Sequence, residues 1–393
     1  MIPRDELLGG GTPPSGRWTT IAQWRTTGDS LVAVFDYPDP SYALGLLPYA
    51  LERLGGRDLQ VAVPTDAVEA TRHRAAMLTA DIEVLEQVGA EVRPVPASTS
   101  GDALVWYAKR GPVTDVVGVD EFNGPPWLVD LVDWLESRRV ERIRRSQYWS
   151  WHYRGRQILR IGKSGGTYRL LAGVAYAKPR EDQPAPVRVE AAADPGPTAQ
   201  EIETIKEALD RAIERRRVGV DRGHREHLLQ AALAVDPSIL AMTRLVREFP
   251  AWRPSLSDAG GRGFIDFLGV DVDGGLHVIE TKIGPDPMLG LQGLDYWAWV
   301  TAHKDEVSAC LGLEPSEEPV GLHYVIATSG KTLIHQAAAE TMRRLGPDIP
   351  WRCHVITDWN TVDRPRRLLR PQPVAGIRAR TVPYEGMLDG PHR

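Results

Sequence analysis

Two acidic residues and a lysine stand in a stretch that otherwise has the pattern of a buried β-hairpin. The segment GGRGFIDFLGVDVDGGLHVIETKIG, residues 260–284, contains two apolar runs joined by a glycine-containing turn. Asp266 lies in the first run, and Glu280 and Lys282 lie in the second. Charged side chains are rarely buried without a partner, so these three residues are candidates for a functional site.

Strand geometry brings these side chains within reach of one another. Successive side chains alternate between the faces of a strand, so Glu280 and Lys282 share one face and Thr281 points to the other. If the turn is centred on Asp273, Asp266 lies directly opposite Glu280, and a neighbouring choice of turn shifts the pairing by one residue. Two carboxylates at close range repel each other unless a cation shares their site. Oxygen-only ligands favour a hard divalent metal, with magnesium the expected ion in a cell.

A metal ion held in this way would favour hydrolysis of a phosphate ester. It would lower the pKa of a bound water and stabilise negative charge on a phosphate oxygen. Lys282 would position the attacking water or stabilise the developing charge. The alternative is a cross-strand surface salt bridge, which the apolar neighbours on both strands disfavour. Asp271 and Asp273 are better explained by the Asp-Gly hairpin turn than by a calcium loop, because the remaining calcium-ligand spacing is missing.

The motif resembles the hydrolytic centre of the PD-(D/E)XK nuclease superfamily, in which an acidic residue on one strand precedes a strand ending in Glu-X-Lys. Asp266 and the ETK sequence at 280–282 are the matching residues. Ile265 stands where the motif has proline, a departure that the superfamily often tolerates. On the preceding helix, Glu226 in HREHLLQAAL occupies the place of a glutamate that faces the metal site.

The following helix also matches this superfamily. QGLDY supplies Gln292 and Tyr296, the Gln-X-X-X-Tyr motif of the RecB-like branch, and residues four apart share one helical face. Residues 199–360 look most like the nuclease domains of archaeal and actinobacterial mismatch endonucleases and of Shedu-type defence nucleases. Glu226 alone would be an ordinary exposed helical residue, and Gln292 and Tyr296 alone would be a surface pair, so their roles depend on the whole pattern.

The resemblance implies a metal-dependent DNA endonuclease in anti-phage defence or DNA repair. Mg²⁺, for which Mn²⁺ substitutes, would be held by Asp266, Glu280, the carbonyl of Thr281 and Glu226. Lys282 would activate the water. The resemblance further implies that Gln292 and Tyr296 position the scissile strand, that the substrate is double-stranded DNA, and that the protein is a homodimer. The alternatives are a ligand-activated RNase and a nucleic-acid-binding regulatory protein with an inactive nuclease fold.

Length and composition indicate a soluble protein of two or three domains. The chain has 393 residues, a net charge of -5, and two cysteines without metal-ligand spacing. No apolar run reaches the length of about 20 residues that crosses a membrane. We therefore expect a cytoplasmic protein that has no membrane partner.

The order of predicted elements indicates an α/β fold. An N-terminal α/β layer with a β-rich extension is expected to precede a restriction-endonuclease-like α/β core, in which helices flank a mixed sheet. In the N-terminal half, a strand is expected at 59–64, a helix over about 67–88, and further strands at 90–96 and 103–109. The expected divisions are a flexible N-terminus (1–16), a recognition or regulatory region (17–178), a linker (179–198), the nuclease domain (199–362) and an Arg/Pro-rich tail (363–393).

Arginines beside aromatic residues in the N-terminal half form a candidate nucleic-acid surface. Arginine side chains neutralise phosphates, and aromatic rings stack on bases. The alternative is a solvated amphipathic face, because acidic residues are interspersed. The candidate contacts are Arg142, Arg144, Arg145, Arg154 and Arg156.

Overall fold

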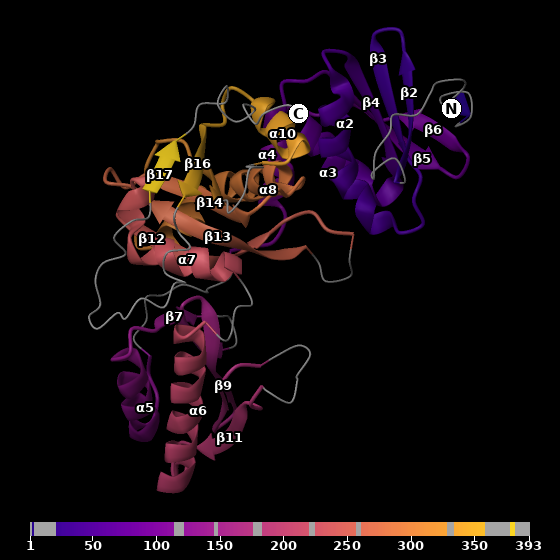
Figure 1. Ribbon diagram of the computed structural model, residues 1–393. Coiled ribbons are helices and arrows are strands. Elements are labelled where there is room, and N and C mark those ends of the chain that lie inside the picture. The colour runs from indigo at the N-terminus through magenta and orange to yellow at the C-terminus, as the bar shows by residue number, and fades with distance from the viewer. Residues whose placement is uncertain are drawn as a thin grey trace.

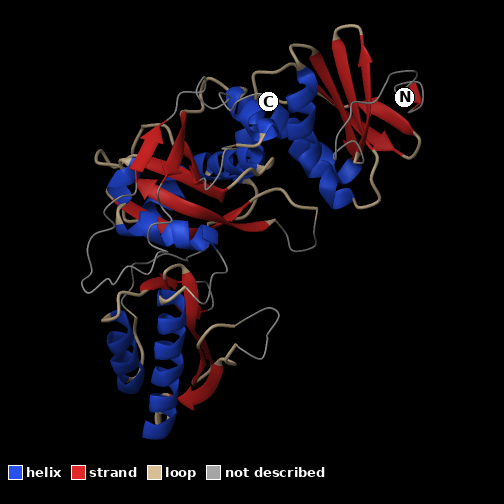
Figure 2. Cartoon of the chain, in the orientation of Figure 1, coloured by secondary structure: helices blue, strands red, loops and turns tan. Residues whose placement is uncertain are grey.

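The chain folds around three β-sheets, each flanked by helices, which confirms the predicted mixed α/β class (Figure 1 and Figure 2). The computed structural model describes residues 2–3, 21–113, 122–144, 148–175, 183–219, 225–256, 261–327, 334–357 and 378–381. Among these residues no helix is both long and apolar enough to cross a membrane.

The first sheet forms the N-terminal part of the molecule, with strand order β1-β6-β5-β4-β3-β2. Strands β3, β4 and β5 pair in parallel, as expected when helices connect successive strands. Its strands are β1 (Ile2–Pro3), β2 (Ala22–Thr27), β3 (Ser30–Phe35), β4 (Asp58–Pro64), β5 (Ile82–Val88) and β6 (Glu91–Pro94); its helices are η1 (Pro40–Gly45), α2 (Leu46–Leu54), α3 (Thr65–Ala75) and α4 (Ser100–Ala108).

Two element predictions in this part were wrong. The helix expected over 67–88 is the shorter α3 followed by strand β5, whose β-branched and alternating residues suit a sheet. The strand expected at 103–109 is helix α4. Its start is fixed by a capping box, in which Thr99 and Asp102 satisfy each other's backbone N–H groups.

The second sheet belongs to a separate middle domain with its own hydrophobic core. Five antiparallel strands, in the order β11-β10-β9-β8-β7, carry helices α5 and α6 on one face (Figure 1). The elements are α5 (Pro126–Glu136), β7 (Glu141–Arg144), β8 (Tyr148–Tyr153), β9 (Arg156–Ser164), β10 (Thr167–Ala172), β11 (Val187–Ala192) and α6 (Ala199–Arg217).

This domain corrects the predicted divisions between 179 and 225. The expected linker contains strand β11, which pairs with β10 along its whole length. Helix α6, expected to open the nuclease domain, places Ile205 and Leu209 in the core of the middle domain. The prolines around β11 concealed a short alternating strand. The apolar stripe of α6 is typical of a helix that covers a sheet, but the stripe does not identify which sheet it covers.

The third sheet is mixed and has the order β12-β13-β14-β15-β16-β17. Helix α7 packs against β12 and β14, and α8 packs on β14 and β15. The elements are α7 (Arg225–Val235), η2 (Pro237–Leu240), β12 (Arg244–Trp252), β13 (Arg262–Val270), β14 (Leu276–Ile283), α8 (Leu289–Ala302), α9 (Lys304–Cys310), β15 (Gly321–Ala327), α10 (Gln336–Arg343), β16 (Trp351–Thr357) and β17 (Arg378–Thr381).

Strands β12, β17 and β1 were not predicted as strands. Strand β12, which contains Pro250, forms the edge of the sheet, where proline is tolerated. Strand β17 lies within the predicted tail and pairs with β16. Strand β1 lies within the predicted flexible N-terminus and pairs with β6. The rest of the predicted N-terminus, and most of the tail, lie outside the described residues.

The N-terminal part and the third sheet share one continuous core rather than forming independent domains. Buried residues of β3, β4, α2 and α3 belong to the same cluster as those of α8, β15 and α10. At this junction Arg74 of α3 donates two hydrogen bonds to Asp295 of α8, at 2.8 and 2.6 Å. The Tyr107 hydroxyl of α4 donates a third to Asp295, at 2.7 Å. The N-terminal helices therefore hold the helix that carries Gln292 and Tyr296.

The middle domain meets the third sheet through a second buried arginine. The side chain of Arg247, on β12, is 0% exposed. It contacts Glu141 of β7 at 3.1 Å and the Nδ1 of His152 of β8 at 2.9 Å. A turn of the middle domain also touches α7, since a Cβ at Gly155 would overlap the backbone carbonyl of His227. The N-terminal part and the middle domain therefore both pack against the strands and helices that carry the candidate site residues.

Candidate active site

The hairpin of β13 and β14 has the register that places Asp266 opposite Glu280. Phe267 pairs with Ile279 and Leu268 pairs with Val278, so the turn is centred on Asp273, which confirms the predicted register. The paired residues end at Phe267, and the strands separate beyond it. The candidate residues therefore lie at the open end of the hairpin.

A distortion of the neighbouring strand accompanies this opening. Arg247 and Phe249 of β12 pair with the residues on either side of Asp266, and Glu248 between them has a φ of 55°. A non-glycine residue in the left-handed region is strained, and such residues are frequent at functional sites. The backbone N–H of Asp266 points to Glu280 Oε1, at 3.4 Å.

The carboxylate of Asp266 is held by hydrogen bonds. Its Oδ2 accepts from the backbone N–H of Thr281 at 2.8 Å and from the Thr281 hydroxyl at 2.6 Å. The side-chain amide of Gln230, a buried residue of α7, reaches Thr281 Oγ1 at 3.1 Å. Burial raises the pKa of Asp266, although the bonds from Thr281 and the charge of Lys282 oppose the rise. These contacts fix the orientation of the carboxylate, and they show that the Thr281 side chain, expected to point away from the acidic pair, contacts Asp266.

Glu280 is fully buried, with 0% of its surface exposed. Burial raises its pKa well above the ordinary value, and the nearby charge of Asp266 raises it further. No hydrogen-bond donor among the described residues reaches its Oε2. A buried carboxylate oxygen without a partner is energetically unfavourable, and a bound cation would satisfy it.

Lys282 connects the hairpin to helix α7. Its Nζ lies 3.2 Å from Oε1 of Glu226 and 3.9 Å from Oδ2 of Asp286. Burial alone would lower the pKa of this lysine, but the charges of Glu226 and Asp266 outweigh burial and raise it. Burial in turn raises the pKa of Glu226, which Lys282 opposes. The lysine is therefore held as an ammonium among carboxylates.

The two residues of the Gln-X-X-X-Tyr motif lie on α8 in different environments. Tyr296 is buried, and its hydroxyl lies against Gly263 of β13, where a Cβ would overlap it. Burial raises the pKa of Tyr296, and the charge of Glu280 adds to the rise, so the phenol lies near the acidic pair. Gln292 is half-buried one turn earlier on the helix.

The oxygen donors fit a divalent cation in chemical type. The orphaned Oε2 of Glu280, the Asp266 carboxylate and the Thr281 carbonyl would hold it. Among the described residues, no three His, Cys, Asp or Glu side chains are placed to hold a metal together. Glu226, predicted as a further metal ligand, instead makes its direct contact with Lys282.

Sequence reasoning missed three residues near this centre. Gln230 lies four residues after Glu226 and so shares its helical face, a spacing that could have identified it. Asp286 lies four residues after Lys282 and contacts it. Arg253, beyond the end of β12, lowers the pKa of Glu280 through its charge. No sequence signal linked Arg253 to the hairpin.

The histidines of this sheet form a separate cluster. Nε2 of His354 lies 2.9 Å from Nδ1 of His323, and Nε2 of His277 lies 2.8 Å from Asp271. Burial lowers the pKa of His323 to about 2 and that of His354 to about 4, so both are neutral at physiological pH. We therefore interpret His323 and His354 as structural residues of the sheet.

The predicted nucleic-acid arginines are not gathered on one open face. Arg142 contacts Glu136 at 3.4 Å, and both Arg142 and Arg144 lie over the ring of Trp149. Arg154 lies near Tyr153, and its carbonyl accepts hydrogen bonds from Arg216. Arg156 begins β9, beside the turn that touches α7, and Arg145 lies outside the described residues.

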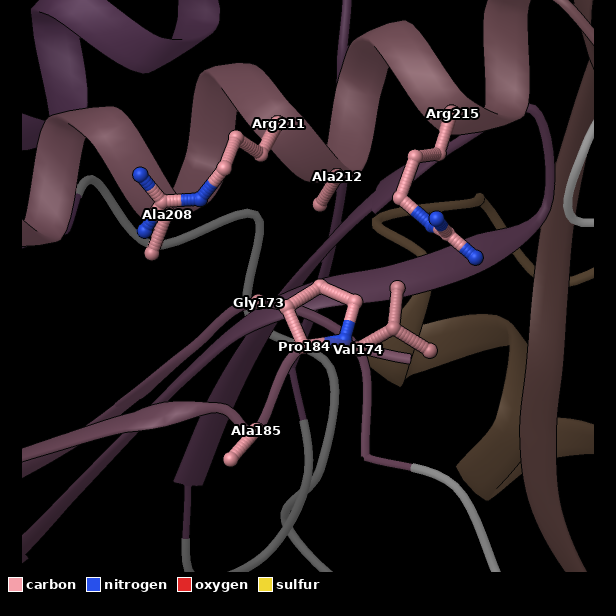
Figure 3. A pocket seen from close by; sticks show the side chains of 8 residues that line it. All are labelled: Gly173, Val174, Pro184, Ala185, Ala208, Arg211, Ala212 and Arg215. Atoms are coloured by element: carbon pink, nitrogen blue, oxygen red, sulfur yellow. The ribbon is translucent and has the colours of Figure 1, made fainter. Parts of the chain in front are cut away.

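One pocket lies in the middle domain and shares no residue with the acidic centre. In Figure 3, Arg211 and Arg215 of α6 face the chain around Gly173 and Pro184. Arg211 pairs with Glu207 at 3.4 Å. The pocket therefore contributes nothing to the chemistry of the hairpin.

Comparisons with known proteins leave the chain without an assigned family. No protein-family model matches it, and no curated protein matches it. Among solved structures, one match is the crystal structure of a repair endonuclease from Pyrococcus abyssi, with 12% identity and a TM-score of 0.17. The match covers 60% of this chain and 98% of that one. A likeness this weak supports no conclusion about the activity of this chain.

Proposed function

We propose that this chain is a metal-dependent nuclease that hydrolyses the phosphodiester bonds of DNA. The observation that carries the proposal is the buried acidic pair at the open end of the hairpin. Glu280 has a carboxylate oxygen without a donor among the described residues, Asp266 lies across from it, and Lys282 is held nearby as an ammonium. Buried like charges of this kind are characteristic of sites that bind a cation.

Each residue has a role in this proposal. Asp266, Glu280 and the Thr281 carbonyl would hold magnesium or manganese, which when bound supplies a Lewis acid for phosphate-ester hydrolysis. Lys282 orients the attacking water and stabilises negative charge on the phosphate. Glu226 keeps Lys282 protonated and in place.

The proposed substrate strand lies beside α8. Tyr296, packed against β13 near Glu280, and Gln292 on the same helix would position the scissile strand. The remaining parts of the proposal come from the resemblance: double-stranded DNA as substrate, a homodimer in the cytoplasm, and a role in anti-phage defence or DNA repair. The competing function is an RNase activated by a ligand bound to the N-terminal sheet.

Plasmid cleavage tests the proposed activity. We expect the wild type to nick or cut plasmid DNA with Mg²⁺ or Mn²⁺ and to be inactive with a chelator. Lys282→Ala should lower the rate at least about a hundredfold, because it removes the ammonium that stabilises the transition-state charge. Equal rates for the wild type and Lys282→Ala would overturn the nuclease assignment. Cleavage of RNA alone, and only after a nucleotide ligand is added, would favour the competing function.

The Glu226–Lys282 pair predicts a change in the pH profile. Because Glu226 raises the pKa of Lys282, Glu226→Gln should lower it, and the ammonium should lose its proton at a lower pH. The alkaline limb of kcat/KM should therefore move to lower pH, with a rate loss of about tenfold near its midpoint. The measurement is plasmid cleavage across the alkaline range.

The matched control for this profile is Asp286→Asn, whose carboxylate is the more distant contact of Lys282, at 3.9 Å. Its shift should be smaller than that of Glu226→Gln. Parallel profiles for the wild type and Glu226→Gln would show that Glu226 does not set the protonation of Lys282.

A further inference from the structure

The strands of the middle domain form a basic unit within an acidic protein. Its five strands contain 7 Lys and Arg against 2 Asp and Glu, whereas the whole chain has a net charge of -5. The two helices of the same domain, α5 and α6, contain 8 Asp and Glu against 5 Lys and Arg. Positive charge is therefore concentrated on the strands, and most of the acids lie on the helices that cover one face of the sheet.

The other face of this sheet carries exposed arginines in adjacent rows. Leu171 of β10 pairs with Arg160 of β9 on one side and with Arg188 of β11 on the other. In the next row, Arg169 of β10 pairs with Glu190 of β11. All three arginines are exposed, and residues paired across strands lie on the same face. Helices α5 and α6 both lie on the opposite face, in the domain core.

An aromatic ring adjoins the first of these rows. The guanidinium of Arg160 lies 4.8 Å from the ring centroid of Tyr148, on β8. Trp151 and Tyr168, in contrast, belong to the core on the helix-covered face. Tyr148 is half-buried, so part of its ring is accessible. We call the surface formed by Tyr148, Arg160, Arg169, Leu171 and Arg188 the basic sheet face.

This basic sheet face extends outward from the catalytic sheet. Along β8, Ser150 and His152 follow Tyr148 on the same face of the strand and lie nearer the third sheet. Both are buried, and His152 contacts Arg247 of β12. The β8–β9 turn at Gly155 lies against His227 of α7, the residue after Glu226. The end of the middle sheet at the β8–β9 turn therefore lies against α7, the helix that carries Glu226.

We propose that the basic sheet face binds the phosphate backbone of the nucleic-acid substrate outside the catalytic centre, with Tyr148 stacking on an unpaired base. Charge complementarity carries this assignment, since the arginines project from neighbouring strands and Glu190, which pairs with Arg169 at 3.2 Å, leaves Arg160 and Arg188 as the exposed cations of the face. A flat sheet with an accessible aromatic ring suits a single-stranded segment better than a rigid duplex. The identity of the ligand as substrate rests on the proposed nuclease function.

Binding in the presence of a chelator tests the basic sheet face without cleavage. A fluorescein-labelled single strand of about 30 nucleotides, longer than one domain occupies, is titrated with the full-length protein. The double variant Arg160→Glu/Arg188→Glu should weaken binding at least about tenfold and reduce the slope of log Kd against log salt by about two. Tyr148→Ala should weaken binding to the single strand more than binding to the matched duplex.

The control is Arg211→Glu on α6, an exposed arginine on the helix-covered side of the same domain. It makes the same Arg-to-Glu substitution at a single site, and its affinity and salt slope should match the wild type. Circular dichroism and thermal melting of every variant check that the domain is folded. If the double variant binds like the wild type, or if Arg211→Glu weakens binding equally, the basic sheet face is not the binding surface.

These experiments distinguish failure of the basic sheet face as a binding surface from failure of the proposed nuclease activity. A wild type that cleaves plasmid while the folded double variant keeps full affinity and rate would overturn the basic sheet face and leave the nuclease intact. Binding that depends on Arg160 and Arg188, in a wild type that never cleaves, would support the basic sheet face and overturn the nuclease.

Discussion

Replacing Glu280 with glutamine should abolish cleavage and at the same time make the metal-free protein more stable. Cleavage should fall by about a thousandfold, because the amide is a poor ligand for the catalytic cation and carries no charge. The gain in stability follows from the burial of Glu280, which is 0% exposed beside Asp266. An isosteric neutral group removes the repulsion and the burial of a charge, which together contribute about 1–3 kcal/mol.

The same variant should change how stability depends on pH. The pKa of Glu280 is raised in the folded state, so folding favours the protonated acid. Its contribution is fully present below the unfolded pKa, near the ordinary value of 4.5, and is lost as the pH rises toward the folded pKa. Glu280→Gln removes this loss, so the free energies of unfolding of the variant and the wild type should diverge as the pH rises above about 4.5.

Denaturant unfolding in chelator at several pH values, paired with plasmid cleavage, measures both effects. The exposed Glu314 provides a matched control, since Glu314→Gln should change neither stability nor cleavage appreciably. Adding Mn²⁺ should stabilise the wild type and not Glu280→Gln. A variant that is less stable than the wild type at neutral pH would show that Glu280 is satisfied without a cation.

Removing Arg74 should destabilise the protein by about 3–5 kcal/mol, because a buried charge loses its partner. Arg74 and Asp295 are 4% and 2% exposed at their side chains, and two hydrogen bonds join them. In Arg74→Ala, the Asp295 carboxylate stays buried with the Tyr107 hydroxyl as a donor. Cleavage should fall as well, since Asp295 precedes Tyr296 on α8.

A double-mutant cycle measures the interaction energy between Arg74 and Asp295 separately from the contacts that each residue makes with other groups. We expect Arg74→Met combined with Asp295→Leu to be much less destabilising than Arg74→Ala, because no buried charge remains without a partner. Arg93→Ala is the control, since Arg93 pairs with Glu86 while its own side chain is 55% exposed. Denaturant unfolding measures each variant. If the losses of unfolding free energy in Arg74→Ala and Asp295→Ala add up to the loss in the Arg74→Ala/Asp295→Ala double variant, the two residues do not stabilise each other, and the N-terminal part is not coupled to α8 through them.

The hairpin was predictable because its determinants are local. The alternation of FIDFL and HVIETK and the Asp-Gly turn set the register, so the pairing of Phe267 with Ile279 follows from sequence. The contact between Lys282 and Glu226 was not predicted: the family resemblance assigned Glu226 to the metal site, and 56 residues separate it from Lys282. Gln230 was missed, although its spacing from Glu226 placed it on the same face of α7.

The boundaries of the domains were less predictable. The apolar stripe of α6 requires a sheet to cover, but the same stripe would suit any sheet. The structure places it on the middle sheet, together with β11, a strand short enough to be mistaken for linker. Arg74 and Arg247 looked like ordinary surface arginines in the sequence, yet both are buried where parts of the chain meet.

The sequence by itself determined the hairpin, its acidic pair and its lysine, because strand alternation and turn chemistry act over a few residues. Only the tertiary structure decided which helices surround that hairpin, where the buried arginines join the three sheets, and that basic residues gather on one face of the middle domain. These features depend on contacts between residues tens to hundreds of positions apart. Such contacts are selected by the packing of whole surfaces, and no local pattern encodes their partners.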